Sequence, residues 1–179
     1  MKKLRYLTRT QIQSLHELGG ARNAQRVMKD LDDYVSSFRD GENVFYLNKE
    51  GRQLTGCKKV SNKSNQAKHY IMRNDVYIAF DCPKDWRTEM KLGVPGEVSI
   101  ICDALFKKEE RFHIVEVDHT QKMSVNKAKI QKYKRMIELG VFDKPPVFIW
   151  MTITKFRREL LLQLCEGLDT IIFTVGDFH

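Results

Sequence analysis

Three long apolar runs in the second half of the chain constrain its fold most strongly. They are Val98–Phe106, Phe112–Val117 and Pro146–Ile153, and they are rich in the β-branched and aromatic residues that favour strands. Only the charged segment Lys107–Arg111 separates the first two runs, which predicts a hairpin. A sheet is therefore expected in this part of the chain.

Helical segments alternate with the later strands. A helix is expected over Ser124–Leu139, between the second and third runs, and another over Phe156–Leu168, before a last strand at Thr170–Val175. The order hairpin, helix, strand, helix, strand predicts an α/β domain with a mixed sheet.

The first sixty residues follow a different pattern. Thr8 and Gln11 have the spacing of a capping box, and the helix that they begin is ended by Gly19-Gly20. Asn23 can cap a second helix over Ala24–Leu31. This part of the chain thus predicts two short helices joined by a glycine turn.

A hairpin is expected to follow these helices. The strand-like runs Tyr34–Val35 and Val44–Leu47 flank Asp40-Gly41, a strong hairpin-turn signal. Helix, turn, helix and hairpin is the order of a winged helix-turn-helix. We therefore expect an α+β chain with a winged-helix domain at 1–60 and, after a polar boundary, an α/β domain at 64–179 that opens with a helix over Ser64–Phe80.

The charge of the chain favours a polyanionic partner. The formal net charge is +8, and residues 1–70 contain 14 Lys and Arg against 7 Asp and Glu, whereas the remaining residues contain 17 against 16. Because nearly all of the excess lies in the winged-helix candidate, double-stranded DNA is the expected partner. The hydrophobic content of 42% excludes a disordered chain. No run is apolar enough for a membrane span or a signal peptide, and the four cysteines have no zinc or disulfide spacing, so no membrane partner and a cytoplasmic location are expected.

The second helix of the winged-helix candidate carries side chains suited to DNA. Arg suits guanine edges and phosphates, whereas Asn and Gln suit adenine. The expected DNA-binding residues are Arg22, Asn23, Gln25, Arg26 and Lys29 on this helix and Arg39 at the hairpin tip. The alternative is a winged fold that makes only protein contacts.

Three acids lie in or beside the apolar strands, where burial of a carboxylate is costly unless a cation pairs with it. Asp103 interrupts the first strand, and Glu116 and Asp118 share a face at the end of the second. If the two strands pair, Asp103 approaches Glu116, and such oxygens suit Mg²⁺ or Mn²⁺. The alternative is that Asp103 and Asp118 are solvated residues at strand ends.

One lysine of the expected helix Ser124–Leu139 falls on its apolar side. Helical spacing places Lys129 in one arc with five apolar residues, Val125, Ile130, Tyr133, Met136 and Ile137. An inward Lys129 can neutralise the strand acids or stabilise a developing phosphate charge, or it can extend to the helix end. The outer bases Lys127, Lys134 and Arg135 either extend a DNA-facing stripe or form a solvated face.

The order of these motifs resembles a known family. Asp103, Glu116-Val117-Asp118 and Lys129 resemble the core of PD-(D/E)XK nucleases. The larger arrangement over residues 7 to 140 resembles the replication-relaxation family, which joins a winged helix to a nuclease-like domain. The matching positions are His69 with Asn74-Asp75-Val76, Trp86 with Glu89, Asp103, Glu116-Val117-Asp118-x-Thr120, and Lys129-x-x-x-Tyr133.

The resemblance implies candidate roles. Asp103 and Glu116 would be metal ligands for Mg²⁺ or Mn²⁺, Lys129 a relocated catalytic lysine and Glu89 a helper, with Asp118 a further catalytic candidate. This chain has Cys102 in place of the usual proline and Asp118 in place of the usual lysine.

These departures favour a non-catalytic nuclease-like domain. We therefore expect a sequence-directed duplex-DNA-binding protein of a plasmid, phage or mobile element, acting in replication, relaxation or transcriptional control. Its possible further partners are a second copy of the chain and replication or relaxation proteins. The alternatives are a metal-dependent endonuclease that nicks or cuts DNA, and a protein-binding adaptor.

Overall fold

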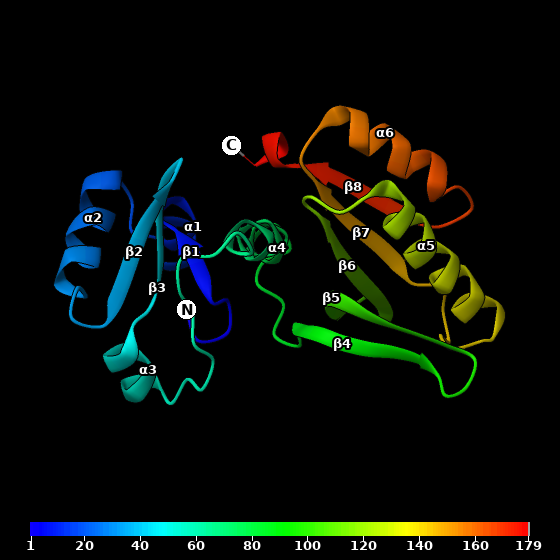
Figure 1. Ribbon diagram of the computed structural model, residues 1–179, viewed down its shortest axis with the longest axis horizontal. Helices are drawn as coiled ribbons and strands as arrows, with labels where there is room; N and C mark the ends of the chain where they lie inside the picture. The colour runs from blue at the N-terminus through cyan, green and yellow to red at the C-terminus, as the bar shows by residue number, and fades with distance from the viewer. Residues whose placement is uncertain (179) are drawn as a thin grey trace. The chain divides into compact units, whose positions relative to one another are not determined.

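The computed structural model describes residues 1–178 and divides into two compact units, Met1–Ile78 and the residues from Ala79 on (Figure 1). Each unit has its own sheet, one of three strands and one of five. The α+β class expected from the sequence is confirmed.

The first unit packs helices against a small antiparallel sheet whose strand order is β1-β3-β2. Its elements are β1 (Tyr6–Thr8), α1 (Arg9–His16), α2 (Ala21–Asp30), β2 (Val35–Asp40), β3 (Glu42–Leu47), α3 (Lys49–Thr55) and α4 (Ala67–Ala79).

Local signals explain most of these elements. The Thr8 hydroxyl accepts a hydrogen bond from the Gln11 backbone and the Gln11 side chain accepts one from the Thr8 backbone, so the expected capping box is confirmed. Gly41 has a φ of +75° at the expected hairpin turn, a conformation that glycine adopts without strain. Helix α3 was not expected from the sequence, and the Asn48 side chain caps it by accepting a hydrogen bond from the Gly51 amide.

Helix α4 belongs to the first unit, and the domain boundary therefore differs from the expected one at residues 60–64. The Asn74 side-chain amide donates to the backbone carbonyls of Leu4, at 3.2 Å, and Tyr6, at 2.7 Å. The Gln11 amide donates to the Asp75 carboxylate at 2.7 Å. The polar segment before α4 is a connection within the unit, and the chain divides after Ile78.

The second unit is built on a mixed sheet of order β4-β5-β6-β7-β8, in which β4, β5 and β6 pair antiparallel and β6, β7 and β8 pair parallel. Its elements are β4 (Arg87–Val94), β5 (Val98–Lys108), β6 (Arg111–Asp118), α5 (Met123–Glu138), β7 (Val147–Thr152), α6 (Lys155–Leu164), β8 (Thr170–Thr174) and the short 3₁₀ helix η1 (Val175–Asp177). The expected hairpin, helices and parallel strands are confirmed. Strand β4 was missed because it is a half-exposed edge strand with few apolar residues.

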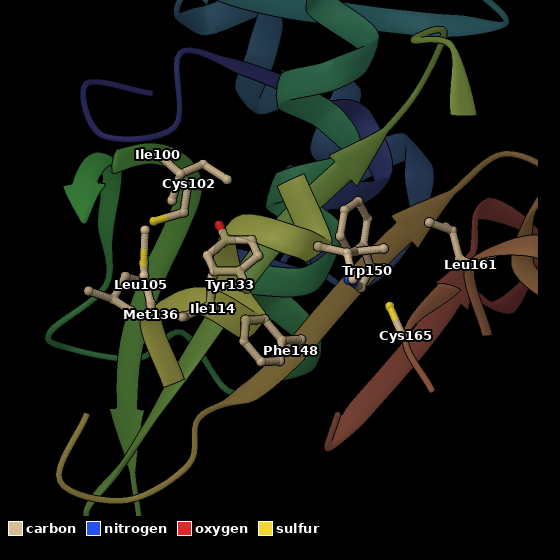
Figure 2. Close-up of a cluster of buried hydrophobic side chains, with 11 residues drawn as sticks. Ile100, Cys102, Leu105, Ile114, Tyr133, Met136, Phe148, Trp150, Leu161 and Cys165 are labelled. Atoms are coloured by element: carbon tan, nitrogen blue, oxygen red, sulfur yellow. The ribbon is translucent and has the colours of Figure 1, made fainter. Parts of the chain in front are cut away.

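Helices α5 and α6 cover one face of this sheet (Figures 1 and 2). Figure 2 shows Tyr133 and Met136 of α5 among Ile114, Phe148 and Trp150 of the sheet. The inward face of α5 also includes Asn126, whereas Val125, expected to face inward, is 43% exposed. The helix is therefore rotated so that a polar side chain, not the valine, enters the core.

Candidate functional site

The exposed side of α2 carries a basic stripe. Arg22, Gln25, Arg26 and Lys29 are all exposed, and their spacing of three and four residues places them on one side of the helix. Ala24 and Met28 on the other side are buried. The burial pattern thus turns three cations and one amide of α2 toward solvent.

The other two expected DNA-binding residues differ from this stripe. The Asn23 amide donates to the Leu18 carbonyl at 2.9 Å, and its oxygen accepts from Arg26 at 3.0 Å. Asn23 is therefore half-buried and supports the turn before α2, and it does not cap the helix, because α2 begins earlier with Gly20 as its N-cap. Arg39 is exposed near the end of β2, as expected for the hairpin tip.

Two contacts surround this hairpin tip. The Asp40 carboxylate pairs with Lys68 at 3.2 Å, and the Glu42 carboxylate accepts hydrogen bonds from the backbone and hydroxyl of Thr10. Both acids beside Arg39 thus have local partners within the first unit.

In the second unit, the strand acids form two separate networks. In the first, Glu116 is fully buried, and its Oε2 lies 2.5 Å from the Lys129 ammonium. The Tyr133 hydroxyl donates to the other carboxylate oxygen, Oε1. Asp103 of β5 accepts a hydrogen bond from the backbone amide of Val117 at 2.7 Å. This bond holds the Asp103 side chain against β6, the strand that carries Glu116. The expected approach of Asp103, Glu116 and Lys129 is therefore present.

Burial and like charge control the protonation of Glu116. Complete burial, reinforced by the nearby Asp103 charge, raises the pKa of the Glu116 carboxyl to about 8, although Lys129 and Tyr133 oppose the rise. Burial alone lowers the pKa of the Lys129 ammonium, but the Glu116 and Asp103 carboxylates outweigh it, so this pKa is raised. Lys129 therefore remains the cation of the pair.

Asp118 forms the second network, with partners that the sequence did not indicate. Arg157 donates to both oxygens of this buried carboxylate, at 2.7 and 2.5 Å, and Asn126 and Thr152 each donate to it at 2.8 Å. Burial raises the pKa of Asp118, but the hydrogen bonds of Arg157, Asn126 and Thr152 outweigh it and hold the pKa below its ordinary value. Asp118 thus pairs with α6 rather than with Lys129.

One sequence signal could have revealed Arg157. Thr154 caps α6 by accepting a hydrogen bond from the Arg157 amide, so this arginine lies in the first turn of the helix. A cation there opposes the helix dipole and calls for an acidic partner nearby.

The side chains that donate hydrogen bonds to Glu116 and Asp118 suit neutralisation of these carboxylates within the protein better than metal binding. Both oxygens of Glu116 are engaged by Lys129 and Tyr133, and Asp118 is saturated by Arg157 and its neighbours. Within residues 1–178, the structure has no group of three or more His, Cys, Asp or Glu side chains arranged to hold a metal ion. No metal-dependent step is therefore assigned to Glu116 or Asp118.

Among the helices of residues 1–178, none has the length and apolar character needed to span a membrane.

Comparisons with known proteins complete the description. No curated protein matches the chain. The crystal structure of protein VC1899 from Vibrio cholerae is similar over 88% of this chain, with 13% sequence identity and a TM-score of 0.47, and this chain spans 40% of the length of that structure. The family model described as replication-relaxation matches residues 1–149, which include the whole first unit and β4, β5, β6 and α5 of the second. The chain belongs to the replication-relaxation family.

Proposed function

We propose that this chain binds duplex DNA through α2 and acts in the replication or relaxation of a plasmid, phage or mobile element, or in its transcriptional control. Membership of the replication-relaxation family suggests the replication role. The observation that carries the proposal is the exposed basic stripe of Arg22, Gln25, Arg26 and Lys29 on α2.

The surroundings of α2 suit a recognition helix. Helices α1 and α2 follow one another across a glycine turn, and the hairpin β2–β3 comes next, with β1 paired to the other edge of β3. This order and pairing resemble a winged helix-turn-helix, in which the second helix enters the major groove. In that arrangement Arg22, Arg26 and Gln25 face base edges and phosphates, and Arg39 contacts the backbone beside the hairpin.

The double substitution Arg22→Ala with Arg26→Ala tests this proposal. Removing two exposed cations from α2 is expected to raise the Kd for a duplex of about 30 base pairs roughly 10- to 100-fold, and to weaken its salt dependence. Fluorescence anisotropy over a range of salt concentrations measures both effects.

The matched control is Lys84→Ala with Lys144→Ala, which removes two exposed charges from the second unit. If the α2 variant binds as tightly as this control, α2 is not the DNA-binding element. A stronger effect of the α2 variant on one duplex sequence than on others would support sequence-directed binding.

The second unit is proposed to be a nuclease-like unit without catalysis. Lys129 and Tyr133 occupy both oxygens of the buried Glu116, which is the arrangement of a neutralised core acid. A metal-dependent endonuclease is the second candidate, and one observation favours it: Asp103 and Glu116 are close enough for the charge of one to raise the pKa of the other.

Incubation of supercoiled plasmid with Mg²⁺ or Mn²⁺ separates these two versions. We expect no nicking by the wild type above the level of Glu116→Gln, because the Glu116 oxygens are already bound. Nicking that requires Glu116, and that Glu138→Gln on the exposed side of α5 retains, would contradict the non-catalytic version.

A further inference from the structure

Helix α5 of the second unit has an unusual distribution of charge. From His119 to Ile137 the chain contains no Asp or Glu, although six Lys and Arg lie in this stretch. Residues 79–179 contain 16 Lys and Arg against 15 Asp and Glu, so the remainder of the unit is acidic overall. The near-neutral second unit is thus an acidic body with one basic helix.

Five of these six cations avoid the core. Lys129 turns inward to Glu116, whereas Lys122, Lys127, Lys132 and Arg135 are exposed and Lys134 is half-buried. On α5, the side chains from Lys134 round to Lys132 cover an outer arc of roughly 160°. Figure 1 shows the length of α5 along the outside of the sheet. A continuous basic surface therefore follows the helix axis.

Several of these cations are already held in place. Lys132 donates to the Ser99 carbonyl at 3.1 Å and Lys134 donates to the Glu166 carbonyl at 2.8 Å, so each ammonium keeps donors for another acceptor. Arg135 is instead paired with Glu97 and Glu138 at the C-terminal end. The basic surface is thus strongest over Lys127, Lys132 and Lys134, which all lie in this outer arc.

This charge pattern does not serve the stability of α5. Lys122 is the N-cap residue and forms no side-chain cap, and the first turn has no acid, although acids are the residues that favour a helix N-terminus. Lys132 and Arg135 are spaced by three residues, which places two like charges side by side on the outer side of the helix. A surface that opposes local stability in this way indicates a binding role.

We propose that the outer face of α5 is a second DNA-binding surface, which contacts phosphates of the duplex backbone without reading its sequence. This inference rests on the proposed DNA-binding function and adds a contact in the second unit. From Lys127 to Lys134 the helix rises about 10 Å, which is about the length of three nucleotides along one strand. Lysine suits this role because it binds phosphate as a point charge.

The triple variant Lys127→Gln, Lys132→Gln and Lys134→Gln tests the proposal in the full chain. Each lost phosphate contact reduces the slope of log K against log salt by about 0.9, so a reduction of about 2 to 3 is expected with a random-sequence duplex. The matched control is Lys84→Gln, Lys91→Gln and Lys144→Gln, which removes three exposed charges elsewhere in the same unit. Circular dichroism and thermal unfolding identify any variant that fails to fold, and Lys127→Gln with Lys132→Gln alone then replaces the triple variant.

The outcomes separate this inference from the proposed function. If the α5 variant and its control have equal slopes of log K against log salt, the inference is overturned. A protein partner for α5 would give this result. If Arg22→Ala with Arg26→Ala abolishes binding while the α5 variant binds normally, only the α2 surface contacts DNA. If the α2 variant still binds and the α5 substitutions remove that binding, the α5 surface stands and the α2 assignment fails.

Discussion

Replacing Arg157 with alanine is expected to lower the free energy of unfolding of the second unit by about 3–5 kcal/mol and its Tm by more than about 10 °C. The Asp118 carboxylate is fully buried, and the charged Arg157 guanidinium donates to both of its oxygens. Without the Arg157 guanidinium, the buried Asp118 charge is stabilised by two neutral donors, Asn126 and Thr152. Urea and thermal unfolding measure the loss.

Arg158→Ala is the matched control for this prediction. Arg158 is the next residue of α6 and pairs with Asp177 at 3.6 Å on the surface, so its removal is expected to change the unfolding midpoint little. Equal effects of the two substitutions would contradict the role given to Arg157. Arg157→Lys is expected to fall between them, because lysine keeps the charge but not the two-pronged geometry.

The pH dependence supplies a second test of the same pair. The pKa of Asp118 is lowered in the folded protein, so its contribution to stability is present above the ordinary Asp pKa of about 3.9 and is lost as the pH falls through the lower folded value. The difference in the free energy of unfolding between wild type and Arg157→Ala should therefore become smaller only in acid, below about pH 4.

The Glu116 network is expected to have the opposite pH dependence. The folded pKa of Glu116 is about 8 and the ordinary value is 4.5, so its contribution is complete below pH 4.5 and is lost as the pH rises to 8. The maximum slope of the free energy of unfolding is about 1.4 kcal/mol per pH unit, which amounts to at most roughly 5 kcal/mol over this range. Glu116→Gln removes the ionisable group and should lack this decline.

The measurement is the free energy of unfolding of both proteins from pH 5 to pH 9. Wild type should lose stability relative to Glu116→Gln across this range, and the two curves should become parallel above about pH 8. Glu138→Gln, on the exposed side of α5, should follow the wild-type curve. If Glu116→Gln also follows the wild-type curve, Glu116 does not titrate in this range.

The sequence predicted the regular elements where local signals were strong. The Thr8–Gln11 capping box, the Asp40-Gly41 turn and the apolar run of β6 each depend on residues close in sequence. Strand β4 alternates half-buried and exposed positions, but only Met90, Leu92 and Val94 mark the pattern, and it was missed. The domain boundary depends on packing between residues far apart in sequence, which periodicity does not report. The same limit explains why α4 was expected in the wrong unit.

The candidate sites divide in the same way. The exposed stripe of Arg22, Arg26 and Lys29 follows from helical spacing alone, whereas Asn23 was misinterpreted because the helix starts three residues earlier than expected. The apolar arc of α5 placed Lys129 inward and left its role open, and the structure pairs it with Glu116. The pairing of Asp118 with Arg157 joins residues 39 positions apart and required the fold.

The hydrogen bonds of Asn74 also bear on how the protein is made. They join α4 to Leu4 and Tyr6, residues 70 and 68 positions earlier in the chain, and Ala67 and Tyr70 complete a buried cluster with Tyr6. A ribosome that has released only the first sixty residues has therefore produced the exposed basic helix α2 but not the segment that completes its unit. The first unit can close only when α4 has left the exit tunnel, by which time the chain of the second unit is already being synthesised.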